Sequence, residues 1–160
     1  MFSLTKKTDY ALLALCCLAS EADGTSMNAK AIAERYSIPV ELLAKILQQL
    51  TKRNLVDSTS GPTGGYRLSR QPDKISVADV MYAVDGQPAL LQCLKGAGDE
   101  CSQFATCTIR HPMEVVQNRL ARVLEDTTVQ DLILSESGLV TVDTKGRKHC
   151  RDSEQSVAAN

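Results

Sequence analysis

Residues 27–69 place the tightest limits on the fold of this chain. Residues 27–36 have the apolar spacing of a short helix, which a break at 37–39 interrupts. Pro39 is tolerated in the first turn of a following helix, which we expect to run to about Arg53. The second helix has one apolar face, made of Leu42, Leu43, Ile46, Leu47 and Leu50. Two short helices joined by a tight turn are typical of a helix-turn-helix, although an ordinary helical hairpin has the same pattern.

The next residues predict a β-hairpin. Residues 55–59 and 66–69 have the composition of short strands, and 60–65 form a glycine-rich turn between them. A hairpin directly after the second helix is the layout of a winged helix-turn-helix. Gly64 and Gly65 would allow the backbone to approach a phosphate closely, although a hairpin that only completes the domain has the same pattern.

Four other segments have helical spacing: residues 8–20, 76–84, 112–125 and 127–134. The first is apolar nearly all round and should be buried, with Thr5 or Thr8 as its cap. The second opens with the pattern of a capping box, from Ser76 to Asp79. The third begins at Pro112, a residue favoured at the first helical position. Its apolar stripe has few partners in so small a domain, so we expect a homodimer through this helix.

These patterns divide the chain into four parts. Residues 1–85 form the winged helix-turn-helix and 86–111 a cysteine-rich loop. Residues 112–135 form the dimerisation helix region, and 136–160, where the composition turns polar, form a disordered tail. The predicted fold class is therefore mostly α, with a small β-hairpin wing and a long dimerisation helix.

Three cysteines lie close together in the predicted loop. Cys93, Cys101 and Cys107 are separated by glycines and few apolar residues, which indicates a loop. A disulfide would use two of these thiols, whereas a soft metal ion or an iron–sulfur cluster can use all three. The spacing lacks the short cysteine pair of a usual zinc site. From spacing alone, a cluster, a zinc ion and a thiol–disulfide switch all remain open.

Composition limits the compartment and the partners. The longest apolar run, residues 10–19, is too short to span a bilayer. We therefore expect a cytoplasmic protein with no membrane partner, in which thiols stay reduced. Cys16 and Cys17 lie in that run and should pack as small hydrophobic residues. Residues 1–70 carry nine Lys and Arg against six Asp and Glu, a balance that suits an anionic partner such as nucleic acid.

Three motifs together resemble the Rrf-two family of iron–sulfur regulators, over roughly residues 1–135. The motifs are LTKKTDYA at residues 4–11, GPTGGYRL at residues 61–68, and the three loop cysteines. The resemblance implies a homodimer that binds palindromic promoter DNA. It also implies an iron–sulfur cluster whose presence or type sets which DNA is bound.

The resemblance implies a ligand set as well. Cys93, Cys101 and Cys107 match the family's cluster cysteines. Members similar to NsrR take their fourth ligand from an aspartate in the first helix of the other subunit, a position that Asp9 matches. Members similar to IscR use a histidine shortly after the third cysteine, and His111 lies one position farther than in their pattern. We therefore predict Asp9, with His111 as the alternative, and a [2Fe–2S] cluster, with [4Fe–4S] as the alternative.

On this interpretation, the second helix and the wing bind DNA. Glu41, Ala44 and Lys45 should face base edges, and the positions nearer phosphates should be Lys52, Thr63, Gly64, Gly65 and Arg67. The predicted function is a regulator that senses iron–sulfur status, redox state or nitric oxide. The alternative is a winged-helix repressor without a cluster, with a thiol switch or a zinc ion instead. We expect no enzyme, because no residue is suggested that would orient His111 beside a cysteine nucleophile.

Overall fold

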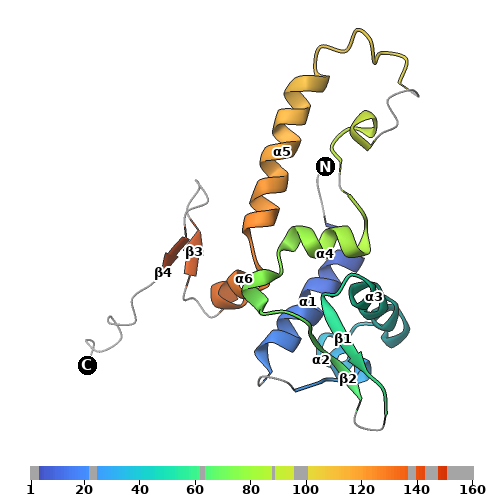
Figure 1. The fold of residues 1–160 in the computed structure, drawn as a ribbon, viewed down its shortest axis with the longest axis vertical. Coiled ribbons are helices and arrows are strands. Elements are labelled where there is room, and N and C mark those ends of the chain that lie inside the picture. The colour runs from blue at the N-terminus through green and yellow to red at the C-terminus, as the bar shows by residue number, and fades with distance from the viewer. Residues whose placement is uncertain are drawn as a thin grey trace.

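Helices dominate the structure, a computed structural model that describes residues 4–21, 25–61, 64–87, 89–95, 101–136, 140–142 and 148–150 (Figure 1). Its α-helices are α1 (Lys6–Ser20), α2 (Ala29–Tyr36), α3 (Val40–Lys52), α4 (Val77–Val84), α5 (Arg110–Asp126) and α6 (Val129–Glu136). The strands are β1 (Val56–Thr59), β2 (Gly65–Leu68), β3 (Val140–Val142) and β4 (Lys148–Cys150). Two short 3₁₀ helices are η1 (Pro72–Lys74) and η2 (Gln92–Lys95). The order agrees with the predicted mostly α fold with a hairpin wing.

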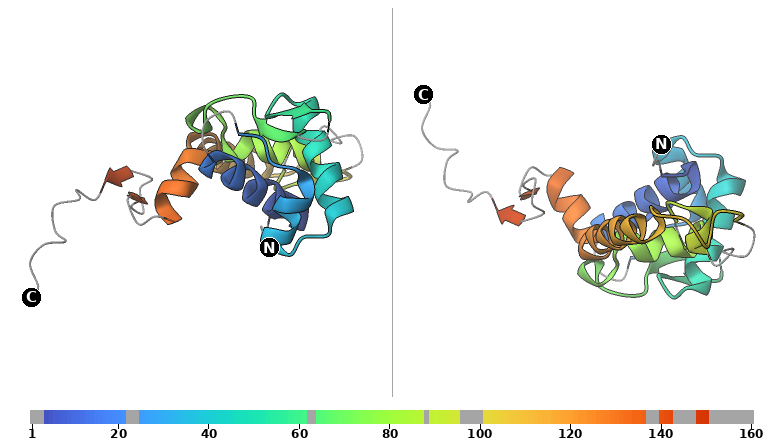
Figure 2. Two further views of the ribbon diagram at one scale, coloured as in Figure 1. Left: turned by 90° about the horizontal axis from the view of Figure 1, so that it is seen from below. Right: turned by 90° about the horizontal axis from the view of Figure 1, so that it is seen from above.

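The first helix, α1, lies at the centre of the core. Ala11, Ala14 and Leu15 have no exposed surface, and the helix packs against α3, α4, α6 and β2. Figure 2 shows α1 between α6 and the α2–α3 pair. Of the two predicted caps, Thr5 is the N-cap, because its hydroxyl accepts a hydrogen bond from the Thr8 amide at 3.2 Å.

The predicted helix-turn-helix is formed by α2 and α3. A residue in the left-handed region, Ser37 with φ 53°, ends α2, and Pro39 directly precedes α3. The apolar stripe of α3 is buried in the core, through Leu43, Ile46, Leu47 and Leu50. The regular hydrophobic spacing therefore identified this element correctly.

The wing has an additional partner that the sequence did not reveal. We expected Met27 in α2, but Asn28 is the N-cap of that helix and Met27 lies outside it. Met27 instead exchanges two backbone hydrogen bonds with Tyr66 of β2, at 2.9 and 2.8 Å. β1 and β2 pair antiparallel, with Val56 opposite Leu68 and Thr59 opposite Gly65. The segment before α2 thus joins the wing as a single-residue third strand.

The paired glycines of the wing serve this packing. A Cβ added at Gly65 would lie 2.6 Å from the Met27 carbonyl oxygen, and one added at Gly64 would collide with the Thr59 carbonyl. Both contacts are with backbone, which cannot move aside as a flexible side chain can. These contacts give the two glycines a role in packing, and their expected close approach to a phosphate stays a prediction.

The helices after the wing differ in how deeply they pack. The predicted capping box of α4 is present, with reciprocal hydrogen bonds between Ser76 and Asp79. α5 begins at Arg110, before the predicted start at Pro112, which lies in a first turn whose amides need no helical partner. No residue of α5 is buried, and Figure 1 shows it projecting from the core. None of the helices in the described part of the chain is long and apolar enough to cross a membrane.

Part of the predicted disordered tail is ordered as a hairpin. β3 pairs antiparallel with β4, with Val140 opposite Cys150 and Val142 opposite Lys148. The prediction of disorder is therefore wrong for these two strands, because the β-branched run at residues 140–142 favours an extended backbone. The other residues of the tail after Glu136 lie outside the described ranges.

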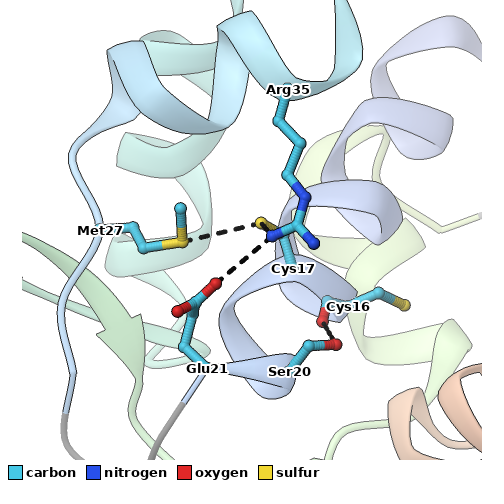
Figure 3. A network of polar contacts seen from close by, with 6 residues as sticks. All are labelled: Cys16, Cys17, Ser20, Glu21, Met27 and Arg35. Atoms are coloured by element: carbon cyan, nitrogen blue, oxygen red, sulfur yellow. Dashed lines mark hydrogen bonds and ion pairs between the residues drawn. The ribbon is translucent and has the colours of Figure 1, made fainter.

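A buried thiol links α1 to α2 (Figure 3). Cys17 is 1% exposed, donates toward the Met27 sulfur at 3.7 Å, and accepts from Arg35 Nη1 at 3.4 Å. Arg35 also pairs with Glu21 at 3.3 Å. The Cys17 sulfur raises the pKa of the Arg35 guanidinium above its ordinary value. The prediction that Cys17 packs as a small hydrophobic residue is confirmed for its burial but missed these polar contacts.

We predict that Cys17→Ala lowers the free energy of unfolding by about 1 kcal/mol, because it leaves a small cavity and removes both sulfur contacts. Cys16→Ala is the matched control, because Cys16 is only half-buried and its side chain points away from Arg35 in Figure 3. Urea unfolding of both variants measures the difference. Equal losses would contradict a specific role for Cys17.

Candidate DNA interface and cluster-binding loop

The exposed face of α3 carries the residues that we expected to face base edges. Glu41 and Lys45 are exposed and Ala44 is half-buried. Positions three and four apart lie on one side of a helix, so the three residues share a face. Val40 extends this face at the start of the helix, where it is 43% exposed. The structure therefore brings the predicted base-facing residues together on one solvent-facing surface.

The wing carries a guanidinium whose charge is partly offset. Arg67 of β2 lies opposite Asp57 of β1, and its Nη2 is 3.5 Å from the Asp57 carboxylate. Both side chains are 52% exposed, so solvent screens the pair strongly. Lys52 is exposed in the last turn of α3. Thr63, the remaining residue predicted to lie near phosphates, is outside the described ranges.

The orientation of the wing relative to α3 depends on a residue that the sequence analysis missed. Asn54 has φ 55°, in the left-handed region, directly after α3. Its carbonyl oxygen accepts from Ser69 Oγ at 2.5 Å and from Arg70 Nε at 3.3 Å. These bonds tie the chain after β2 to the end of α3. An asparagine just beyond a helix terminus is the local signal that could have identified this position.

In chain order, the three loop cysteines lie between α4 and the start of α5. Cys93 is in η2 and half-buried, Cys101 is exposed, and Cys107 is half-buried. All three are free thiols. Turns after Cys101 order the second part of the loop, where the amide of Phe104 donates to the Cys101 carbonyl at 3.0 Å. The Arg110 guanidinium lies 4.3 Å from the Phe104 ring centroid, which links the loop to the first turn of α5.

The two candidates for a fourth ligand have different surroundings. Asp9 is half-buried in the first turn of α1. His111 is in the first turn of α5, where its side chain is 85% exposed and its Nδ1 is 3.7 Å from a Glu114 oxygen. Within the described residues, no group of three or more His, Cys, Asp or Glu side chains is gathered closely enough to hold a metal ion. Residues 96–100 of the loop lie outside these ranges.

A scan of family models gives one match over most of the chain. The matching model is that of the Rrf2 family, which is the Rrf-two family that the motifs resemble. It is described as an iron-dependent transcriptional regulator and matches residues 4–135. NsrR of Bacillus licheniformis, an HTH-type transcriptional regulator, is 31% identical over 133 residues, covering 83% of this chain and 93% of that protein. NsrR of Oceanobacillus iheyensis is 32% identical over 140 residues, covering 88% and 95%.

Solved structures have the same fold. CymR, the global cysteine regulator of B. subtilis, superposes with a TM-score of 0.67 at 23% identity, covering 84% of this chain and 98% of that chain. T. potens IscR superposes with a TM-score of 0.64 at 23% identity, covering 90% and 95%. They confirm the predicted winged-helix fold class. Together with the match over residues 4–135, the sequence relatives show that the chain belongs to the Rrf2 family of DNA-binding transcriptional regulators.

Proposed function

We propose that an iron–sulfur cluster controls DNA binding by this regulator, and that Cys93, Cys101 and Cys107 hold the cluster with Asp9 of the partner subunit. The signal would be iron–sulfur status, redox state or nitric oxide. The observation that carries the proposal is the set of three free thiols on one loop, in a family described as iron-dependent.

The donor set fits such a cluster chemically. Thiolates are the usual ligands of iron–sulfur clusters, and the free state of all three cysteines keeps them available. A carboxylate is a harder ligand and a poorer match for this iron, so a fourth position at Asp9 would be the weakest. When bound, the cluster would supply iron that reacts with oxygen or nitric oxide. The cysteines and Asp9 of the partner subunit would hold the loop in one arrangement.

Two features of the structure support a homodimer. α5 exposes Val115, Val116, Leu120 and Val123, each at least 36% accessible, on a helix with no buried residue. A second copy of the chain would cover this face, as expected for a symmetric dimer. Two copies of α3 could then reach half-sites about 34 Å apart on palindromic DNA.

We predict that anaerobically reconstituted protein contains iron and sulfide, and that Asp9→Ala alters its absorption spectrum and speeds cluster loss. Thr5 rather than Asp9 caps α1, so the substitution should cost folding only about 0.3–1 kcal/mol through the helix dipole. Iron and sulfide counts and the visible spectrum measure the effect. The counts and the spectrum also decide between [2Fe–2S] and [4Fe–4S].

His111→Ala is the matched control for the ligand assignment. Its side chain is largely exposed, so we expect an unchanged spectrum and rate of cluster loss. A change confined to the His111 variant would show that Asp9 is the wrong ligand. Zinc without sulfide in the wild-type protein would contradict the proposed cluster.

We predict that Lys45→Ala changes which base pairs are preferred at one position of each half-site. A side chain that contacts a base edge contributes about 1–3 kcal/mol of discrimination. Lys74→Ala in η1 is the control, because Lys74 is an exposed lysine outside α3 and the wing. Binding to a randomised operator library measures both variants. Equal base preferences in the Lys45 variant and the wild type would contradict base contact by Lys45.

We predict that Val123→Glu yields a monomer. Val123 is 59% exposed in the isolated chain, so its replacement should leave the fold intact but would bury a charge in the dimer. Val40→Glu is the control, since Val40 is 43% exposed but lies in α3. Light scattering at micromolar concentration gives the masses. A wild-type protein that is already monomeric would contradict dimerisation through α5.

A further inference from the structure

One carboxylate joins the beginning of α1 to the end of α4. Asp85 Oδ2 accepts hydrogen bonds from the hydroxyls of Thr5 and Thr8, both at 2.5 Å. The threonines are 80 and 77 positions away in the chain. We propose that Asp85 is a positioning residue that holds the first turn of α1, and with it Asp9, against the chain entering the cysteine loop. This role rests on the proposed function, in which Asp9 is a ligand of the cluster on the partner subunit's loop.

The location of Asp85 indicates that its carboxylate stabilises α1 rather than its own helix, α4. Asp85 is the C-cap of α4, and a carboxylate at a helix C-terminus is disfavoured by the helix dipole. The same carboxylate lies at the N-terminus of α1, where the dipole favours a negative charge. Gly86 follows with φ 78° and turns the chain out of α4 toward the loop. The favourable interaction of Asp85 is therefore the one with α1.

Burial makes the contact costly to lose. Thr8 has no exposed surface, so without Asp85 its hydroxyl would be buried without this acceptor, which is unfavourable for a polar group. The Thr5 hydroxyl accepts from the Thr8 amide at 3.2 Å and donates to Asp85. The carboxylate thus fixes both the N-cap of α1 and the turn that follows it. Among the described residues, no buried side-chain nitrogen or oxygen lacks a partner.

The contact between Asp85 and α1 lies between the loop and α3. On one side, residues after Gly86 enter the loop, where the Leu90 amide donates to Gln117 Oε1 of α5 at 3.0 Å. On the other side, the buried face of α1 packs against α3. Figure 1 shows the end of α4, where the chain leaves toward the loop, beside the start of α1. A change in the loop could therefore reach α3 through Asp85 and α1.

Asp85→Ala tests this role, with Asp79→Ala as the matched control. Both replace an aspartate of the α4 caps, but Asp79 bonds Ser76 at the opposite end of the helix. In the cluster-free full-length protein, we expect Asp85→Ala to lower hydrogen-exchange protection at the Thr8 and Asp9 amides about tenfold. Asp79→Ala should leave these amides unchanged. Asp85→Asn keeps one acceptor oxygen and should restore part of the protection.

The second readout is the ratio of operator affinities with and without the cluster. We expect this ratio to fall toward one in Asp85→Ala and to stay at the wild-type value in Asp79→Ala. Unchanged protection at Thr8 and Asp9 would overturn the positioning role, and lost protection with a wild-type ratio would overturn the coupling to DNA. A wild-type ratio of one would refute the proposed function instead, while the exchange comparison would still decide whether Asp85 holds α1.

Discussion

Burial of α1 is the constraint on which the rest of the structure depends. α3, α4, α6 and β2 all pack against this helix, and Ala11, Ala14 and Leu15 are completely enclosed. Protein interiors are close-packed, so α1 cannot shift without moving its neighbours. Its C-terminal part contacts α2 through Cys17 and Arg35, and its first turn contacts the end of α4 through Asp85. One helix therefore relates the DNA-binding elements to the entrance of the cysteine loop.

The cysteine loop and α5 are stabilised differently from this core. α5 buries none of its residues, and the described thiols are not gathered around a common point. A bound cluster and a second subunit would supply the missing contacts. A loop whose order depends on a ligand is suited to a switch, because ligand binding can then bias the packed core between two arrangements.

Local patterns in the sequence predicted the elements well but not the contacts between them. Regular apolar spacing identified α3 and its buried stripe, and the capping box identified the start of α4. The pairing of Met27 with Tyr66 and the bonds from Thr5 and Thr8 to Asp85 join distant segments, so no local pattern encodes them. The spacing of the cysteines identified candidate ligands. It did not predict their positions in space, because a local pattern does not encode contacts between distant segments. Gly64 and Gly65 were recognised as special, but their close contacts with Met27 and Thr59 were not foreseen.

The central claim is that a cluster held by the loop cysteines controls operator binding. The most direct test measures operator affinity of one anaerobic preparation as its iron and sulfide are removed stepwise, with Cys101→Ser treated in parallel. The account predicts that wild-type affinity changes in proportion to the cluster lost, and that the Cys101 variant has the affinity of the cluster-free protein throughout. Wild-type affinity that stays constant from full occupancy to complete removal would contradict it.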